Sequence, residues 1–151
     1  QSHVTYAHLR SKVCCALYCL WARSILNGLD IDAAWSDAVT KLRAYLKDKP
    51  EDLEQLEYYI RPDELEKGTG SGYVVDCLKS ARYALQQTTY QDVIKTAIAF
   101  GRDTDTTACV AGGIAGLYFG FDSIPESWLA QLRAKDLVEP LLAKLLSNVP
   151  A

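Results

Sequence analysis

The sequence predicts an all-α fold, a compact orthogonal helical bundle around a central helix of small residues. Three observations lead to this prediction. Apolar residues recur at intervals of three and four along most of the 151 residues, which is the period of one face of an α-helix. No stretch of useful length alternates apolar and polar residues, as a half-buried strand does. One tract, residues 108–121, combines apolar residues with glycine and alanine at helical spacing.

The first half of the chain is predicted to hold two long helices and a less regular acidic segment. Apolar positions between residues 13 and 21 predict the first helix, which ends at Asn27-Gly28. A second apolar period runs from residue 31 to residue 46. Residues 47–72 are acidic and contain two prolines and three glycines, so we expect a short helix between loops there.

The second half of the chain continues the helical period. Apolar positions in residues 74–85 and 90–98 predict two helices, and the small-residue tract predicts a third. Leucines close the chain in two further helical patterns that separate near Ala134. The length is that of one ordinary domain with its own core.

Charge and composition argue against several classes of partner. The formal net charge is −3 and no block of consecutive lysines or arginines occurs, so we expect neither nucleic-acid binding nor membrane binding. The apolar tract from Ala108 to Phe121 is shorter than the roughly 20 residues of a membrane-spanning helix. The five cysteines, an odd count without a CxxC pair, indicate buried thiols in a reducing compartment. We therefore expect a soluble, cytoplasmic protein.

The stretch RDTDTTA crowds Asp103, Asp105 and Thr106 together just before the small-residue tract. Residues at i and i+2 point to opposite sides of a regular helix, so the two carboxylates converge only in a loop or a first helical turn. We expect the helix to begin after them. Two close carboxylates repel unless a cation lies between them, and carboxylate and hydroxyl oxygens suit Mg²⁺ or Mn²⁺. The alternative is helix capping by Thr104 or Asp105, with the acidic first turn favoured by the helix dipole.

The tract that follows is predicted to be the central helix. Its small residues recur at close to helical spacing, namely Ala108, Ala111, Gly112, Ala115, Gly116 and Gly120. A face with so little side-chain bulk lets neighbouring helices approach closely, which offsets the ~1 kcal/mol that a glycine costs inside a helix. We therefore expect this helix to be buried, and we expect a leucine at position 116 to destabilise the fold.

The residues DTDTT also match the Asp-x-Asp-x-Thr pattern of phosphotransferases that use an aspartate nucleophile. That chemistry needs a hydrophobic strand leading into the first aspartate. The preceding residues, DVIKTAIAFGR, instead have a helical period and a Gly-Arg break. The phosphotransferase is therefore a minor alternative.

Three segments resemble the ADP-ribosylglycohydrolase family: SHVTYAHLRSKVCCALYCLWARSILNG, SGYVVDCLKSARYAL and AFGRDTDTTACVAGGIAGLYFGFDSIPESWL. The resemblance runs from Ser2 to about Leu132, with a weaker middle, and places residues 1–151 in the C-terminal half of the family domain. It implies an all-helical fold with a centre of two Mg²⁺ or Mn²⁺ ions. The implied reaction is hydrolysis of the N- or O-glycosidic bond between ADP-ribose and a protein side chain.

The same resemblance implies roles for two groups of residues. Asp103, Asp105 and Thr106 match the family's C-terminal metal ligands, and it identifies no catalytic residue beyond these ligands. A substrate-facing loop of the family corresponds to Gly70, Ser71, Gly72 and Tyr73. The backbone amides of such a loop could approach a phosphate or a ribose. The alternative for this loop is an ordinary helix-entry turn with Ser71 as the cap. Tyr73 could stack on adenine or could serve only in packing.

The sequence departs from the family pattern in two places. Thr5-Tyr6 stands where family members have Thr-His, and His8 is expected to be an ordinary surface histidine. The family's N-terminal half, which carries further metal ligands and the acidic residue that activates water, is not found in this sequence. The chain begins at Gln1 and contains no methionine, so whether it is a fragment is an open question.

The resemblance also implies partners. They are an ADP-ribosylated protein or ADP-ribose, and the N-terminal half of the same family domain. Two other functions are kept as alternatives: a catalytically inactive relative that binds ADP-ribose, and a structural all-α protein whose aspartates only cap a helix.

Overall fold

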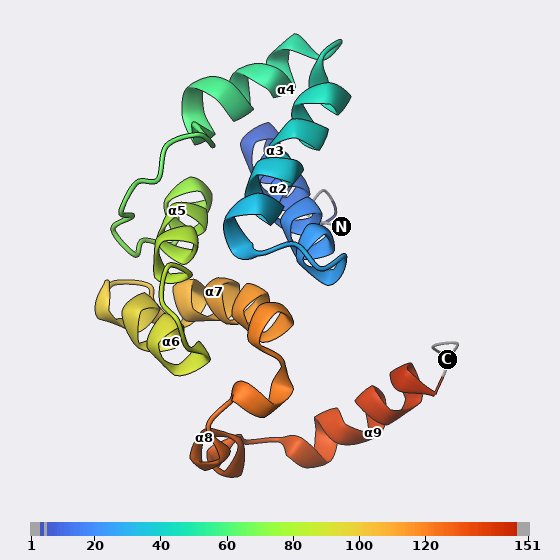
Figure 1. Ribbon diagram of the computed structural model, residues 1–151, viewed down its shortest axis with the longest axis vertical. Coiled ribbons are helices and arrows are strands. Elements are labelled where there is room, and N and C mark those ends of the chain that lie inside the picture. The colour runs from blue at the N-terminus through green and yellow to red at the C-terminus, as the bar shows by residue number, and fades with distance from the viewer. Residues whose placement is uncertain (1–3, 5, 148–151) are drawn as a thin grey trace.

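The fold is built from helices throughout (Figure 1). The structure, a computed structural model, describes residues 4 and 6–147, and no β-strand occurs among those residues. In chain order the elements are α2 (Leu9–Leu26), α3 (Ile31–Leu46), α4 (Pro50–Glu54), the π-helix η1 (Gln55–Ile60), α5 (Val74–Ala84), α6 (Tyr90–Ala99), α7 (Thr104–Phe119), the 3-10 turn η2 (Phe121–Ser123), α8 (Glu126–Gln131) and α9 (Lys135–Leu146). The predicted all-α class is confirmed.

The local sequence sets the ends of the first two long helices. His8 precedes α2, and its Nδ1 accepts a hydrogen bond from the backbone N–H of Arg10 at 3.2 Å. Asp30 caps α3 in the same way, accepting from the backbone N–H of Ala33 at 2.8 Å. Gly28 connects the two helices at φ +90°, where residues with a side chain are strained. α2 therefore ends at the predicted Asn-Gly turn, and His8 is a helix cap.

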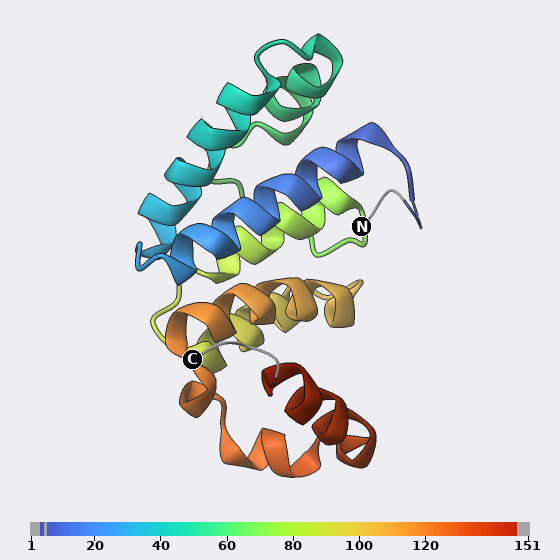
Figure 2. The same ribbon diagram turned by 90° about the vertical axis from the view of Figure 1, so that its right-hand side faces the viewer.

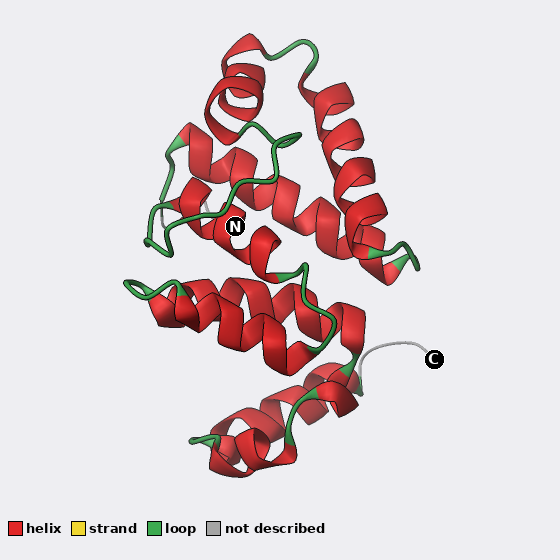
Figure 3. Cartoon of the chain, turned by 60° about the vertical axis from the view of Figure 1, so that its left-hand side comes forward, coloured by secondary structure: helices red, strands yellow, loops and turns green. Residues whose placement is uncertain are grey.

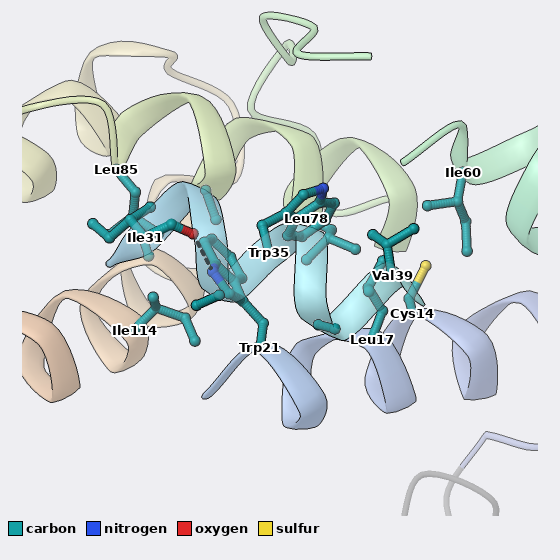
Figure 4. Packing of buried hydrophobic residues seen from close by; sticks show 14 of the residues in the cluster. Cys14, Leu17, Trp21, Ile31, Trp35, Val39, Ile60, Leu78, Leu85 and Ile114 are labelled. Atoms are coloured by element: carbon teal, nitrogen blue, oxygen red, sulfur yellow. Dashed lines mark hydrogen bonds between the residues drawn. The ribbon is translucent and has the colours of Figure 1, made fainter. Parts of the chain in front are cut away.

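The centre of the core lies where α2, α3 and α5 meet (Figure 4). Trp21 and Trp35 pack edge to face, with their ring centroids 4.9 Å apart. The indole N–H of Trp21 donates to the carbonyl of Ile31 at 3.1 Å, and that of Trp35 donates to the carbonyl of Pro62 at 2.8 Å. Each buried indole is thereby satisfied, which a buried tryptophan requires. Other fully buried side chains of the core include Leu17, Leu56, Ile60, Leu85 and Ile114.

The helices are arranged in two layers (Figure 2). α3 packs on α2 in one layer, and α6 packs on α7 in the other. α5 contacts both α2 and α7, so it joins the layers. A Cβ added at Gly112 of α7 would lie 3.1 Å from Ile94 Cδ1 and 3.4 Å from the Tyr90 hydroxyl. The missing side chain at this position therefore allows α6 to approach α7 closely, as predicted.

The rest of α7 does not match the expectation of a fully buried helix. Its buried residues are Thr107, Ala111, Ile114 and Ala115, and its opposite face is exposed. No atom beyond the helix backbone lies within 4 Å of a Cβ added at Gly116. The expectation that a larger residue at position 116 would overpack the core is wrong, because this glycine faces open space.

The acidic segment forms the predicted short helix, in two parts. α4 begins at Pro50, which needs no N–H there, and runs directly into the π-helix η1. η1 ends at Arg61, whose φ of 51° is left-handed. Arg43 of α3 fixes η1 in place, because its Nε donates to Glu57 Oε1 at 2.7 Å. A long loop then leads to α5 and is drawn green in Figure 3.

α8 lies beyond the α6 and α7 layer, and α9 extends from it away from the rest of the chain (Figure 1). Trp128 of α8 lies near Tyr90 of α6, with ring centroids 6.4 Å apart. α9 has no buried residue, although it carries leucines at helical spacing. None of the helices in the described part of the chain combines the length and the hydrophobicity of a membrane span.

Candidate metal and substrate site

Asp103, Asp105 and Thr106 come together at the N-terminus of α7. The helix begins at Thr104, so Asp103 is the N-cap and Asp105 lies in the first turn. The expectation that the helix begins after both aspartates is wrong, because it begins between them. The capping alternative names the wrong residues, because the N-cap is Asp103 and neither Thr104 nor Asp105. The side chain of Asp103 makes no regular capping hydrogen bond, but the backbone N–H of Thr106 helps to lower the pKa of Asp103, so the carboxylate also faces the first turn of the helix.

The start of α7 favours negative charge on Asp103. The side chain of Thr106 makes the largest contribution to lowering the pKa of Asp103, followed by the side chain of Asp105. The unpaired N–H groups at a helix N-terminus also favour an anion. Asp103 is half-buried, whereas Asp105 and Thr106 are exposed. An ionised carboxylate is thus presented close to a second carboxylate and a hydroxyl.

These oxygen donors suit a hard divalent cation. Mg²⁺ and Mn²⁺ prefer carboxylate and hydroxyl oxygens, whereas zinc sites are usually built from thiolate and imidazole. Within residues 4 and 6–147, no group of three or more His, Cys, Asp or Glu side chains is placed to hold a metal ion. The candidate donor set is therefore two carboxylates and one hydroxyl, which fits part of the coordination shell of Mg²⁺ or Mn²⁺.

The loop predicted to face the substrate lies directly against these donors. The backbone N–H of Asp103 donates to the carbonyl of Gly70 at 2.9 Å. A Cβ added at Gly72 would collide with Asp103 Oδ2. Gly70 has φ +71°, and a Cβ there would collide with Phe100. The sequence pattern places the loop and the aspartates 30 residues apart, and the fold brings them into contact.

Asp76 holds this loop in shape, and the sequence analysis missed it. Its carboxylate accepts four hydrogen bonds at 2.7–3.0 Å, from the backbone N–H and the hydroxyl of both Thr69 and Ser71. Partial burial tends to raise the pKa of Asp76, but these hydrogen bonds outweigh it and lower the pKa. The position of Asp76 in the first turn of α5, just after a Ser-Gly loop, is the signal that could have identified it.

The proposed capping role of Ser71 is wrong. α5 begins at Val74, and its N-cap is Tyr73 without a side-chain capping bond. The Ser71 hydroxyl donates to Asp76 Oδ2 at 2.9 Å. Ser71 therefore stabilises the loop from within.

Tyr73 lies at the edge of a cavity of about 300 Å³ between the loop and the start of α2. Its walls also include Tyr6, His8, Arg10 and Gly72. Arg10 Nη1 donates to the Tyr73 hydroxyl at 2.6 Å and so joins the two walls. Tyr6 stacks on His8 with ring centroids 6.1 Å apart. Thr5, the other half of the Thr-Tyr departure, lies outside the described residues.

A second cavity, of about 310 Å³, borders the same site and is mainly apolar. Gly72 and Thr106 line it together with Tyr18 and four cysteines, Cys14, Cys15, Cys19 and Cys77. The expectation that all five cysteines are buried is wrong, because Cys15, Cys19 and Cys109 are exposed. Burial raises the pKa of Cys14 to about 12 and also raises the pKa of Cys77. These two are therefore protonated thiols at neutral pH.

The phosphotransferase alternative is not supported by the element before Asp103. Residues Tyr90–Ala99 form the helix α6, followed by a turn at Gly101. The strand that the phosphotransferase pattern requires before the first aspartate is replaced by a helix.

The chain is similar to known proteins along almost its whole length. The family model described as ADP-ribosylglycohydrolase matches residues 1–150. The chain is 28% identical to the ADP-ribosylarginine hydrolase Tri1 of Pseudomonas putida strain GB-1, over 99% of this chain and 39% of the relative. It is 30% identical to the ADP-ribosylarginine hydrolase Tri1 of Serratia proteamaculans strain 568, over 99% of this chain and 40% of the relative.

A third relative is the ADP-ribosyl-dinitrogen reductase glycohydrolase of Rhodospirillum rubrum. The identity is 25%, over 89% of this chain and 42% of the relative. The chain thus spans about two fifths of the length of these relatives. No solved structure matches the chain.

Proposed function

The chain belongs to the ADP-ribosylglycohydrolase family, and from this premise we propose that its residues serve metal-dependent hydrolysis of the glycosidic bond between ADP-ribose and a protein side chain. The observation that supports this proposal best is the contact between the Gly70–Tyr73 loop and Asp103. It brings backbone amides suited to a phosphate or ribose next to oxygens suited to a divalent cation.

In this proposal Asp103, Asp105 and Thr106 hold two Mg²⁺ or Mn²⁺ ions, together with donors from elsewhere in the family domain. Such ions supply positive charge that orients substrate oxygens and makes a water molecule more acidic. The carboxylates act as ligands, so no covalent bond to the chain is required. Asp76 and Ser80 hold the loop from the protein side, because they accept from the backbone N–H groups of Thr69, Ser71 and Gly70. The loop amides that this proposal assigns to the substrate are therefore those of Gly72 and Tyr73.

Arginine is the acceptor that we propose to test first. The two relatives matched over 99% of this chain are named ADP-ribosylarginine hydrolases. The bond would then be an N-glycosidic bond to a guanidinium group. Release of ADP-ribose from an O-linked serine substrate is the alternative, and a direct comparison of the two substrates separates them.

The metal ligands are tested with a double variant, Asp103→Asn with Asp105→Asn. Mg²⁺ or Mn²⁺ should raise the melting temperature of the parent chain, because a ligand that binds only the folded state stabilises it. The double variant should lose this rise. The matched control, Asp48→Asn with Asp122→Asn, removes the same charge at exposed positions away from the site and should keep it. If the divalent cation raised the melting temperature of all three proteins equally, Asp103 and Asp105 would not be metal ligands.

The reaction is tested by release of ADP-ribose from ADP-ribosylated arginine with Mg²⁺ or Mn²⁺ present. Since three donors do not complete two coordination shells, we expect turnover to need the N-terminal half of the family domain. The assay is therefore run with the chain alone and with that half added. No release in either arrangement would contradict the proposed reaction, and release by the chain alone would contradict the need for a second half.

A further inference from the structure

Arg10 connects three parts of the chain that are distant in sequence. It lies in the first turn of α2, and its Nε donates to Gln55 Oε1 at 2.9 Å. Its guanidinium carbon lies 3.6 Å from the centroid of the Tyr59 ring. Its Nη1 donates to the Tyr73 hydroxyl at 2.6 Å. One side chain therefore contacts the acidic segment on one side and the substrate-facing loop on the other.

The π-helix η1 of the acidic segment contacts the Arg10 side chain through two residues. Gln55 and Tyr59 both belong to η1, where one supplies a hydrogen-bond acceptor and the other an aromatic face. These two contacts use the edge and the plane of the guanidinium group, and they restrict its rotation. The orientation of the guanidinium group is thereby set independently of its hydrogen bond to Tyr73. π-Helices are rare overall, and those that occur are often found at functional sites. Here the π-helix η1 supplies both residues that contact Arg10.

The orientation of the Tyr73 side chain depends on Arg10, because neither burial nor a capping hydrogen bond restricts it. Tyr73 is 51% exposed, and its side chain makes no capping hydrogen bond to α5. It directly follows Gly72, which lies against Asp103. A change in the direction of Tyr73 therefore changes the shape of the cavity that the loop, Arg10 and His8 line.

We infer that Arg10 is a positioning residue: held by Gln55 and Tyr59, it fixes the Tyr73 hydroxyl and so orders the Gly70–Tyr73 loop before ADP-ribose binds. The effect on ADP-ribose affinity rests on the proposed function, whereas the effect on the orientation of Tyr73 does not. Lysine cannot replace Arg10, because an ammonium group lacks the planar fork that binds two partners and stacks on a ring.

The first experiment measures ADP-ribose affinity by calorimetry in the presence of Mg²⁺. Arg10→Ala and Arg10→Lys should each weaken binding by about three- to tenfold, the effect of leaving one side chain to be ordered on binding. Tyr73→Phe removes the hydroxyl that Arg10 binds. In that background, Arg10→Ala should have little further effect. An undiminished loss in the Tyr73→Phe background would overturn the inference, because Arg10 would then act on the ligand itself.

The second experiment follows Tyr73 without any ligand. Fluorine NMR of the chain labelled with 3-fluorotyrosine gives a signal that Tyr73→Phe identifies by its loss. This signal should shift and broaden in Arg10→Ala and in Arg10→Lys. An unchanged signal would overturn the inference. If the parent chain binds no ADP-ribose, either alone or with the N-terminal half of the family domain added, the proposed function fails, and this signal alone decides the role of Arg10.

Arg43→Lys is the matched control for both experiments. Arg43 also donates to η1, through Glu57, but it does not contact Tyr73. This variant should lower the melting temperature while the Tyr73 signal and the ADP-ribose affinity stay at the parent values. If Arg43→Lys changes both as strongly as the Arg10 variants do, the effect comes from general loosening of η1, and the inference is wrong.

Discussion

Gly72 is the residue at which the Gly70–Tyr73 loop lies against the Asp103 carboxylate, and this close approach leaves no room for a side chain. We predict that Gly72→Ala displaces Asp103, because the added Cβ would collide with Asp103 Oδ2. The free energy of unfolding should fall by about 1 to 3 kcal/mol, as overpacking usually costs. The stabilisation by Mn²⁺ should fall with it. Urea unfolding with and without Mn²⁺ measures both effects.

Gly116→Ala is the matched control at a glycine that faces open space. Alanine favours the helix by ~1 kcal/mol over glycine, so this variant should be more stable than the parent and should keep the full Mn²⁺ response. Destabilisation by Gly116→Ala would show that this face of α7 is covered in solution.

Asp76 gives the loop a dependence on pH. Its hydrogen bonds hold the pKa of Asp76 below the ordinary value of 3.8 in the folded protein. A lowered pKa in the folded state contributes stability above the unfolded-state pKa, and this contribution is lost as the pH falls through the folded-state value. Asp76→Asn should therefore be less stable than the parent at pH 7, by about 1 kcal/mol. The difference should narrow below about pH 4. Unfolding by urea at pH 7 and pH 3 tests this, and an equal difference at both values would contradict it.

The sequence predicts some features of the candidate site and misses others for a physical reason. Asp103, Asp105 and Thr106 lie close together in the chain, so their spacing predicts a loop or a first helical turn there, although the helix begins between the aspartates and not after them. Arg10 has its partners 45 and 63 residues away. No local pattern reports such pairs, because only the packing of α2 against η1 and α5 creates them.

At the scale of elements, α6 depends on its cap. Thr89 Oγ1 accepts from the backbone N–H of Asp92 at 3.1 Å and donates to the Asp92 carboxylate at 2.7 Å. We predict that Thr89→Ala lowers the free energy of unfolding by about 1 kcal/mol, the usual loss for an N-cap. Amide hydrogen exchange in the first turn of α6 should also become faster. Thr88→Ala, at an exposed position outside the cap, is the control and should change neither.

The predicted helices also show what hydrophobic period can and cannot establish. Apolar spacing locates the long helices of the two layers correctly because there it follows directly from which face is buried, whereas α9 has leucines at helical spacing without a buried residue. It does not distinguish an α-helix from the π-helix of η1, since that difference lies in backbone hydrogen bonds. It also does not show whether a face of small residues is covered by a neighbouring helix. A Cβ added at Gly112 would contact Ile94, whereas one added at Gly116 would contact no neighbouring atom.

For the whole molecule, the two layers should be stable without the last helix. α9 has no buried residue, and its apolar side chains are exposed, with Leu141 at 69%. We predict that the free energy of unfolding of a chain ending at Ala134, measured with urea, equals that of the parent within about 0.5 kcal/mol. A chain ending at Pro125 should be less stable, because it loses the contact of Trp128 with Tyr90. A large loss on removal of α9 alone would show that this helix packs on the layers in solution.

The hydrogen bond from Asp103 to Gly70 also has a consequence for the order of binding. It joins the backbone of Asp103 to the backbone of the loop, so that a displacement of one is passed to the other. In the proposed function the two ligands are then heterotropic partners. The factor by which a cation tightens ADP-ribose binding must equal the factor by which ADP-ribose tightens cation binding. Product release and cation release would accordingly be linked, and cation concentration would control how long the enzyme retains its product.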